Sequence, residues 1–123
     1  MSKRILESKG GKFPPMVKLQ DKEGSKFVGK LIGSRKGTFG LEFSFNIIDG
    51  DAPICTKTKG EPWKEVSVNP NDVVVVSTSV DSQLERNLKQ AIIGEVVEIV
   101  FHGKVLNPKS GRSYNNYTVA ILE

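Results

Sequence analysis

Basic and aromatic side chains gather in two segments of the sequence, residues 34–40 and 107–114. The first segment reads SRKGTFG and the second reads NPKSGRSY, so each holds two cations, at least one glycine and one aromatic side chain. Cations of this kind contact phosphates and aromatic faces stack on bases, while glycine lets the backbone approach a ligand closely. These residue types are therefore typical of a surface that binds single-stranded nucleic acid. Solvated loop charges are the alternative interpretation.

A third basic stretch, KTKGEPWKE, contains the only tryptophan of the chain, Trp63. A tryptophan beside lysines favours base stacking, but a tryptophan that pins a long loop onto the fold explains the same pattern equally well. Lys104 should point outward from its strand, whereas the side to which Lys30 points stays open. The candidate nucleic-acid-binding residues are Lys30, Arg35, Lys36, Phe39, Lys57, Lys59, Trp63, Lys104, Lys109, Arg112 and Tyr114.

No residue pattern in the sequence predicts catalysis or a bound cofactor. Asp49 and Asp51 flank a glycine in a turn-like DGD motif, and no third acidic residue stands at the spacing of a metal site. His102 is the only histidine and has no sequence-adjacent serine or aspartate partner for general-base chemistry. The chain also lacks a nucleophile elbow and a glycine-rich phosphate-binding fingerprint. We therefore expect no catalytic residue, no metal, no cofactor and no enzymatic activity.

The composition is that of a soluble protein with one domain. The chain has 123 residues, 37% of them hydrophobic and 26% charged, and no apolar run approaches the roughly 20 residues of a membrane span. The single cysteine, Cys55, excludes an internal disulfide, so we expect a cytoplasmic location, in the host cytoplasm if the protein is viral.

Positive charge is concentrated in the first third of the chain. Residues 1–40 hold ten Lys and Arg against three Asp and Glu, a balance of +7, whereas residues 41–123 hold eight against eleven, a balance of −3. The two balances sum to the net charge of +4. This asymmetry indicates an anionic partner, or alternatively a solubilising basic tail.

The N-terminal part of the sequence predicts a flexible arm followed by one folded domain. Residues 1–16 carry a Gly-Gly and a Pro-Pro pair without sustained periodicity, and we expect them to form a basic arm before a domain over 17–123. A first strand is expected within residues 17–33, where Gly29 and Gly33 allow the strand to bend sharply.

Two further strands are expected within residues 41–76. The second covers residues 41–49, LEFSFNIID, in which apolar and polar residues alternate and the phenylalanines belong to the core. Residues 49–72 form a long polar loop or insertion, with a short strand near 66–68. The valine run at 73–76 is β-branched on both faces and predicts a third, central strand.

A helix and two strands complete the predicted domain. Residues 81–94 place leucine, alanine and isoleucine on one stripe of a helix of about three turns. Residues 95–106 and 113–122 alternate as two strands, with Phe101 and Tyr117 on their core faces. Five strands with a single helix between the third and the fourth predict an all-β OB-fold, a five-stranded Greek-key barrel. Its loops between strands one and two and between strands four and five bound the ligand groove, and these are the two basic segments.

The order of elements, the strand LEFSFNIIDGD and the closing GKVLNPKSGRSYNNYTVAI resemble the small OB-fold single-stranded-DNA-binding proteins of tailed bacteriophages. The resemblance covers roughly residues 17–122. It implies a non-enzymatic protein that coats and protects single-stranded DNA in replication and recombination, with replication or recombination proteins as candidate partners. Many such proteins end in a flexible acidic tail, whereas this chain stops at VAILE directly after the last predicted strand.

Two alternatives and one assembly stay open. The same fold and contacts suit an RNA-binding OB module, and the basic loops also suit an OB-fold protein-interaction module that contacts an acidic partner. Because small OB domains cover few nucleotides, a homodimer is a candidate assembly, through the outer face of Val96 and Val100 or through the arm at 1–16. No membrane partner is expected.

Overall fold

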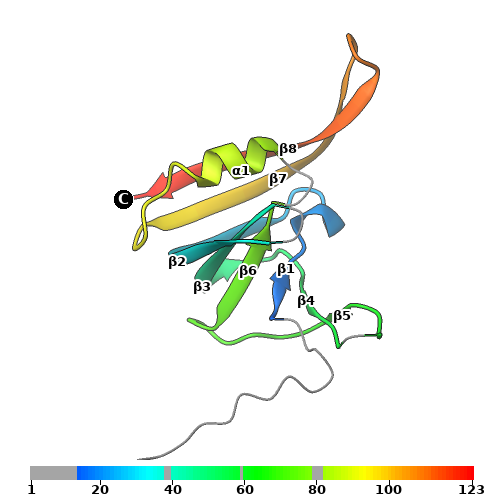
Figure 1. Cartoon of the computed structure of the whole chain (residues 1–123). Helices are drawn as coiled ribbons and strands as arrows, with labels where there is room; N and C mark the ends of the chain where they lie inside the picture. The colour runs from blue at the N-terminus through cyan, green and yellow to red at the C-terminus, as the bar shows by residue number, and fades with distance from the viewer. Residues whose placement is uncertain (1–13, 38–39, 59, 79–81) are drawn as a thin grey trace, which may run out of the picture.

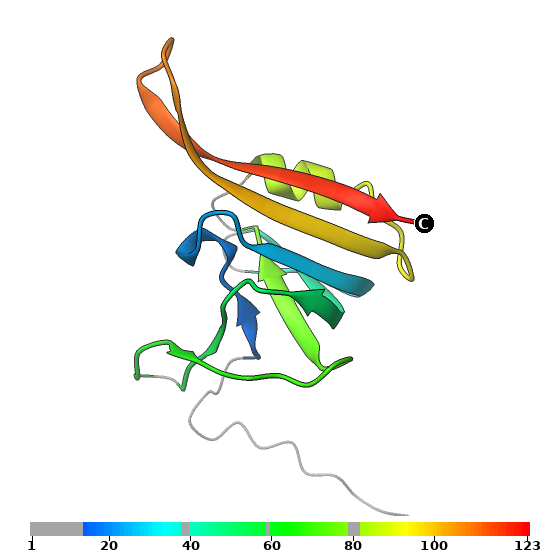
Figure 2. The same ribbon diagram turned by 180° about the vertical axis from the view of Figure 1, so that it is seen from behind.

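The computed structural model describes residues 14–37, 40–58, 60–78 and 82–123, which form a curled, mostly-β fold with one short helix (Figure 1, Figure 2). All eight strands belong to one sheet, in the order β5-β4-β1-β6-β3-β2-β7-β8. The elements in chain order are β1 (Met16–Val17), the 3-10 helix η2 (Leu19–Asp21), β2 (Lys26–Lys36), β3 (Leu41–Gly50), β4 (Ile54–Thr56), β5 (Lys64–Glu65), β6 (Val73–Ser77), α1 (Ser82–Leu88), β7 (Val96–Asn107) and β8 (Arg112–Leu122).

The sheet has eight strands rather than the predicted five, because three short strands extend it. The five long strands β2, β3, β6, β7 and β8 overlap the five segments whose apolar pattern predicts strands. The predicted first strand is divided, since the chain passes through η2 after β1 and β2 begins only at Lys26. Met16, expected in the arm, instead pairs with Cys55 in β4 and with Val75 in β6.

The long connection between β3 and β6 is more ordered than its polar sequence suggests. It contains β4 and β5, which pair through Cys55↔Glu65 and Thr56↔Lys64. The short strand expected near 66–68 is not formed there; Val66 and Val68 lie half-buried and pack against the core instead.

The strand order shows a Greek-key arrangement and an open sheet with two end strands. β7, β2, β3 and β6 are neighbours in that order, and since β2, β3 and β6 are consecutive long strands, this is the Greek-key arrangement. The second edge of β6 is taken by β1, which runs parallel to it. β8 and β5 are therefore the two ends of the described sheet, and the sheet forms a half-barrel.

The register of β2 against β3 shifts between Val28 and Gly29 and again between Leu31 and Gly33. Both shifts occur at the glycines expected to bend the strand. Gly29 is also buried, and a Cβ there would lie 2.7 Å from Cζ of Phe27 and 2.9 Å from Cβ of Phe45. The bend thus brings the two rings together, in an edge-to-face contact with centroids 5.3 Å apart.

The core lies on the concave side of the sheet under α1. Phe43, Phe45, Phe101 and Tyr117 are buried there, as their strand faces predict. α1 lies beside β8 and contributes Leu84 and Leu88 to this core, both fully buried (Figure 1). Within the described residues, no helix has the length and apolar character needed to cross a membrane.

The helix is shorter than predicted and ends at Leu88. The N–H of Gly94 donates to the carbonyl of Leu31, and Glu95 Oε1 accepts the N–H of Ile92 at 2.6 Å. These bonds fix a turn against β2 in which Gly94 has φ +99°. Ile92, expected on the apolar stripe, is consequently 68% exposed.

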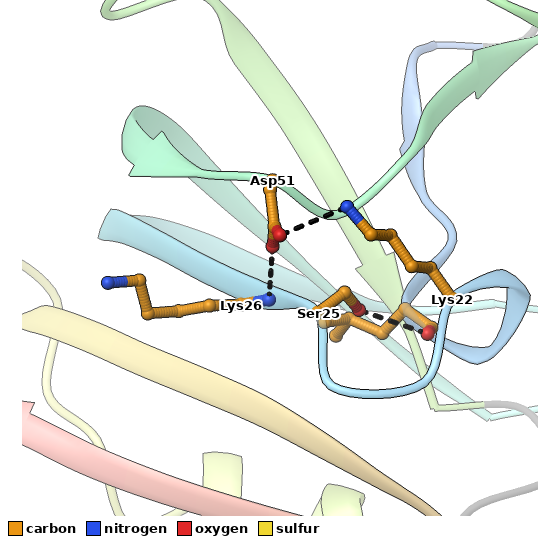
Figure 3. Close-up of polar contacts among 5 residues, drawn as sticks. Lys22, Ser25, Lys26 and Asp51 are labelled. Atoms are coloured by element: carbon orange, nitrogen blue, oxygen red, sulfur yellow. Dashed lines mark hydrogen bonds and ion pairs between the residues drawn. The ribbon is translucent and has the colours of Figure 1, made fainter.

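Asp51 fastens the end of β3 to the start of β2 (Figure 3). Its Oδ1 accepts the backbone N–H of Lys26 at 2.8 Å, and its Oδ2 accepts the ammonium of Lys22 at 3.0 Å. In the same corner the hydroxyl of Ser25 donates to the carbonyl of Leu19. The hydrogen bond from Lys26 and then that from Lys22 lower the pKa of Asp51 below its usual value.

We expect Asp51→Asn to remove an acid-sensitive part of the stability. A lowered pKa means that the folded state binds this proton less readily, so the carboxylate stabilises the fold above its ordinary pKa and this contribution is lost as the pH falls. The urea midpoint of the wild type should therefore exceed that of the variant at neutral pH, and the gap should narrow as the pH falls below about 4. A gap that is equally wide at both pH values would contradict this role.

Candidate nucleic-acid interface

β7 and β8 form a long hairpin whose outer half projects from the sheet. The two strands pair from Val96↔Leu122 to Asn107↔Arg112, whereas β2 lies beside β7 only from Val96 to Val100. Beyond that point β8 is the only strand neighbour of β7 among the described elements. Figure 1 shows the hairpin tip rising away from the rest of the sheet. Every residue from Leu106 to Tyr114 is exposed, so the outer end of this ribbon is open to a ligand.

One face of the projecting hairpin carries a cation and an aromatic ring. Arg112 and Tyr114 are two positions apart in β8, so their side chains lie on the same face, together with their cross-strand neighbours Asn107 and Val105. Tyr114 is 46% exposed, and Arg112 is exposed as well. Lys104 is exposed but belongs to the opposite face of the ribbon by the same alternation.

Polar groups order the turn of the hairpin, and they do so without an ion pair to its cations among the described residues. Asn107 Oδ1 accepts the N–H of Lys109 at 3.0 Å, and Ser110 Oγ accepts the N–H of Arg112 at 3.2 Å. Gly111 has φ +69° and donates its N–H to the carbonyl of Asn107. Neither Lys109 nor Arg112 takes part in an ion pair within the described part of the chain. Both charges are therefore available to an anion.

The end of the β2–β3 hairpin carries the second pair of predicted cations. Arg35 and Lys36 are exposed there, and Gly37 donates its N–H to the carbonyl of Gly40. Arg35 Nε donates to Oε1 of Glu42 at 2.8 Å, directly across the strand pair. An anion must compete with this carboxylate for Arg35, so Arg35 is a weaker candidate than the hairpin cations. Phe39 lies outside the described residues.

Lys30 and Trp63 are both exposed, in different parts of the sheet. Lys30 lies between Asn46 of β3 and Val96 of β7 and points away from the core, which resolves the side that the sequence leaves open. Trp63 immediately precedes β5 and is 41% exposed. The ammonium of Lys57 lies 5.7 Å from the centroid of its ring. Lys59 lies outside the described residues.

The sequence does not predict that Lys18 lies beside Trp63. Lys18 Nζ lies 3.8 Å from the ring centroid, closer than Lys57. Lys18 follows β1, and its N–H donates to the carbonyl of Pro53, so the pairing of β1 with β4 carries it to the tryptophan. No sequence signal joins the two residues, because their proximity depends entirely on that strand pairing.

The candidates thus form separate groups rather than one continuous site. The hairpin tip and the β4–β5 region lie at opposite ends of the molecule in both views (Figure 1, Figure 2). Among the described residues, no group of three His, Cys, Asp or Glu side chains is arranged to hold a metal ion. The arrangement offers cations and exposed rings, which bind anionic polymers with planar bases.

No protein-family model, curated protein or solved structure matches this chain. What the fold and the site define is a class, a mostly-β protein with a curled sheet and a projecting basic, aromatic hairpin. A function for it has to be argued from that geometry.

Proposed function

We propose that this protein is a non-enzymatic OB-fold protein that binds single-stranded DNA with little sequence preference and protects it during replication or recombination. The observation that carries the proposal is the projecting β7–β8 hairpin, which holds Arg112 and Tyr114 on one face and Lys109 at its tip. A single nucleotide unit presents a charged phosphate beside a flat base, and this hairpin presents the complementary pair of groups.

The strand order supports the OB-fold part of the proposal. An OB-fold is a partly open Greek-key barrel of five strands that binds oligonucleotides with its central strands and two of its loops. The long strands β6-β3-β2-β7-β8 follow a Greek-key order, and α1 lies in the sequence between β6 and β7. In this interpretation β1, β4 and β5 are additions at the β6 edge. The projecting hairpin then corresponds to the loop between strands four and five.

Binding in this proposal combines phosphate neutralisation with base stacking. Each cation that contacts a phosphate releases condensed counterions, so the affinity falls as salt rises. A ring such as that of Tyr114 can stack on any base, because every base has a π-face, which gives little sequence preference. In a duplex those faces are already stacked on each other. The stacking contribution therefore favours single strands.

A fluorescence-anisotropy titration tests the proposal. Labelled poly-dT of about 30 nucleotides, long enough for more than one OB-fold site, is titrated with the full chain across a salt series. We expect tight binding that weakens steeply with salt and that unlabelled duplex DNA displaces poorly. An RNA strand of matched length that competes better than DNA would overturn the DNA assignment. No binding at low salt would overturn the proposal as a whole, and the basic groups would then belong to an acidic protein partner.

A further inference from the structure

Trp63 is exposed on a loop that strand pairing and a backbone hydrogen bond also hold in place. The loop is fixed by the β4–β5 pairing and by the hydrogen bond from the N–H of Val66 to the carbonyl of Ile54. Val66 and Val68 supply apolar contacts between this loop and the core. The indole of Trp63 is nevertheless 41% exposed, so part of its ring can contact a ligand.

Two ammonium groups approach this ring from different parts of the chain. Lys18 Nζ lies 3.8 Å and Lys57 Nζ 5.7 Å from the ring centroid, within or near the range of cation–π attraction. This attraction holds positive charge beside an exposed indole. A nucleotide whose base contacts the indole would place its phosphates near these ammonium groups.

The tryptophan group and the hairpin lie too far apart to contact the same nucleotide. β5 and the tip of the β7–β8 hairpin are at opposite ends of the molecule in both views (Figure 1, Figure 2). A strand long enough to reach both would bind at the second point as an intramolecular event, which raises the overall affinity without any new contact at the first.

We propose that Trp63, Lys18 and Lys57 form a second contact point for the strand that the hairpin binds, and that stacking on Trp63 selects unpaired bases. The inference rests on the proposed function and deepens it. The hairpin cations attract any polyanion, whereas the indole accepts only a base with a free face. Stacking on Trp63, at the β4–β5 end of the sheet, thus adds to the single-strand selectivity that Tyr114 supplies at the hairpin.

Intrinsic fluorescence tests this directly, because Trp63 is the only tryptophan in the chain. Saturation of the wild type with poly-dT of about 30 nucleotides should change the emission and shield the indole from acrylamide. Saturation with duplex DNA at low salt should leave both signals largely unchanged. These readouts need no variant, so they do not depend on how a substitution affects folding.

A set of variants measures how much this group contributes to the binding affinity. Trp63→Ala should weaken binding of the long single strand about tenfold, the usual scale of one stacked base, and leave duplex binding unchanged. Trp63→Phe should retain much of the affinity, and Lys18→Ala should lower both the affinity and its salt dependence. Ile92→Ala is the matched control, since it truncates an equally apolar side chain that is 68% exposed in the turn after α1.

Failure of this inference is distinguishable from failure of the proposed function. If the wild type binds the long strand while Trp63 emission, acrylamide quenching and the affinity of Trp63→Ala all stay unchanged, the second contact point is wrong and the hairpin site stands. If the wild type binds no single strand at low salt, the proposed function itself is wrong. An equal loss of single-strand and duplex affinity in Trp63→Ala would also contradict the assigned selectivity.

Discussion

Reversing both hairpin cations, in the double variant Lys109→Glu/Arg112→Glu, is expected to weaken binding of single-stranded DNA between tenfold and a hundredfold, as an order of magnitude, near 0.1 M salt. Both side chains are exposed at the projecting end of the β7–β8 hairpin. Neither is engaged in an ion pair within the described residues, so no internal partner offsets the change. Each substitution removes a phosphate contact and adds a repulsive charge.

The salt dependence separates a local contact from a general effect of charge. Binding to single strands loses about 0.7 in the slope of log affinity against log salt for each phosphate contact, so two lost contacts should lower the slope by about 1.4. The measurement is the same anisotropy titration, repeated at several salt concentrations. A variant whose affinity drops at one salt concentration while its slope stays that of the wild type would argue against direct phosphate contacts.

The double variant Arg86→Glu/Lys89→Glu is the matched control. Both residues are exposed near the end of α1 that points away from the hairpin tip, and the net charge changes by the same amount. We expect this variant to bind within about threefold of the wild type, because only long-range screened repulsion changes. Equal losses in the two double variants would mean that overall charge governs binding, and the hairpin would lose its special role.

Arg35 is expected to contribute less to DNA binding than the hairpin cations, because of its ion pair with Glu42. Glu42 already holds Arg35 at 2.8 Å across the β2–β3 pair, so a phosphate gains from Arg35 only what it can take from that carboxylate. Within the described residues, the hairpin cations have no such competitor. This difference is why the largest loss of affinity is expected at the hairpin, although the sequence ranks both loops equally.

Local patterns in the sequence predict the long strands well. Alternation around Phe43 and Phe45 depends only on which face of one strand is buried, and both are buried. The bend at Gly29 is likewise a property of one strand and its glycines. The hairpin tip follows from two adjacent strands joined by a turn of Asn, Pro and Gly. Each of these features is decided by residues close together in the chain.

Features that depend on distant pairing are the ones that sequence patterns miss. Residue 16 becomes a strand only because β4 and β6 offer it edges to pair with. The contact between Lys18 and Trp63 is a consequence of that same pairing. The helix ends at Leu88 since the following turn bonds to Leu31 in β2, a partner that helical periodicity cannot reveal. The candidate site therefore divides into a hairpin predicted from sequence and a tryptophan group that needed the fold.

Gly50→Ala is expected to have the largest effect on stability, with a loss of about 3–5 kcal/mol in the free energy of unfolding. Gly50 ends β3 with φ +122°, a backbone conformation that side chains rarely adopt. A Cβ at this position would lie 2.3 Å from the carbonyl oxygen of Lys26 and 2.9 Å from Cα of Phe27. These are backbone atoms of β2, so no side-chain rotation can relieve the overlap.

Gly60→Ala isolates the steric part of that loss. Gly60 also has a positive φ, +85°, but a Cβ there would meet no atom within 4 Å, so only backbone strain of about 1 kcal/mol is expected. Both variants add one methyl group, and urea unfolding monitored through Trp63 compares them directly.

The overlap at Gly50 can be relieved only by parting β3 from β2, which also breaks the corner that Asp51 holds. Since a domain of this size has a total stability of about 5–15 kcal/mol, Gly50→Ala should lie close to unfolding while Gly60→Ala stays folded. Equal midpoints for the two variants would show that β3 does not end against β2 as described.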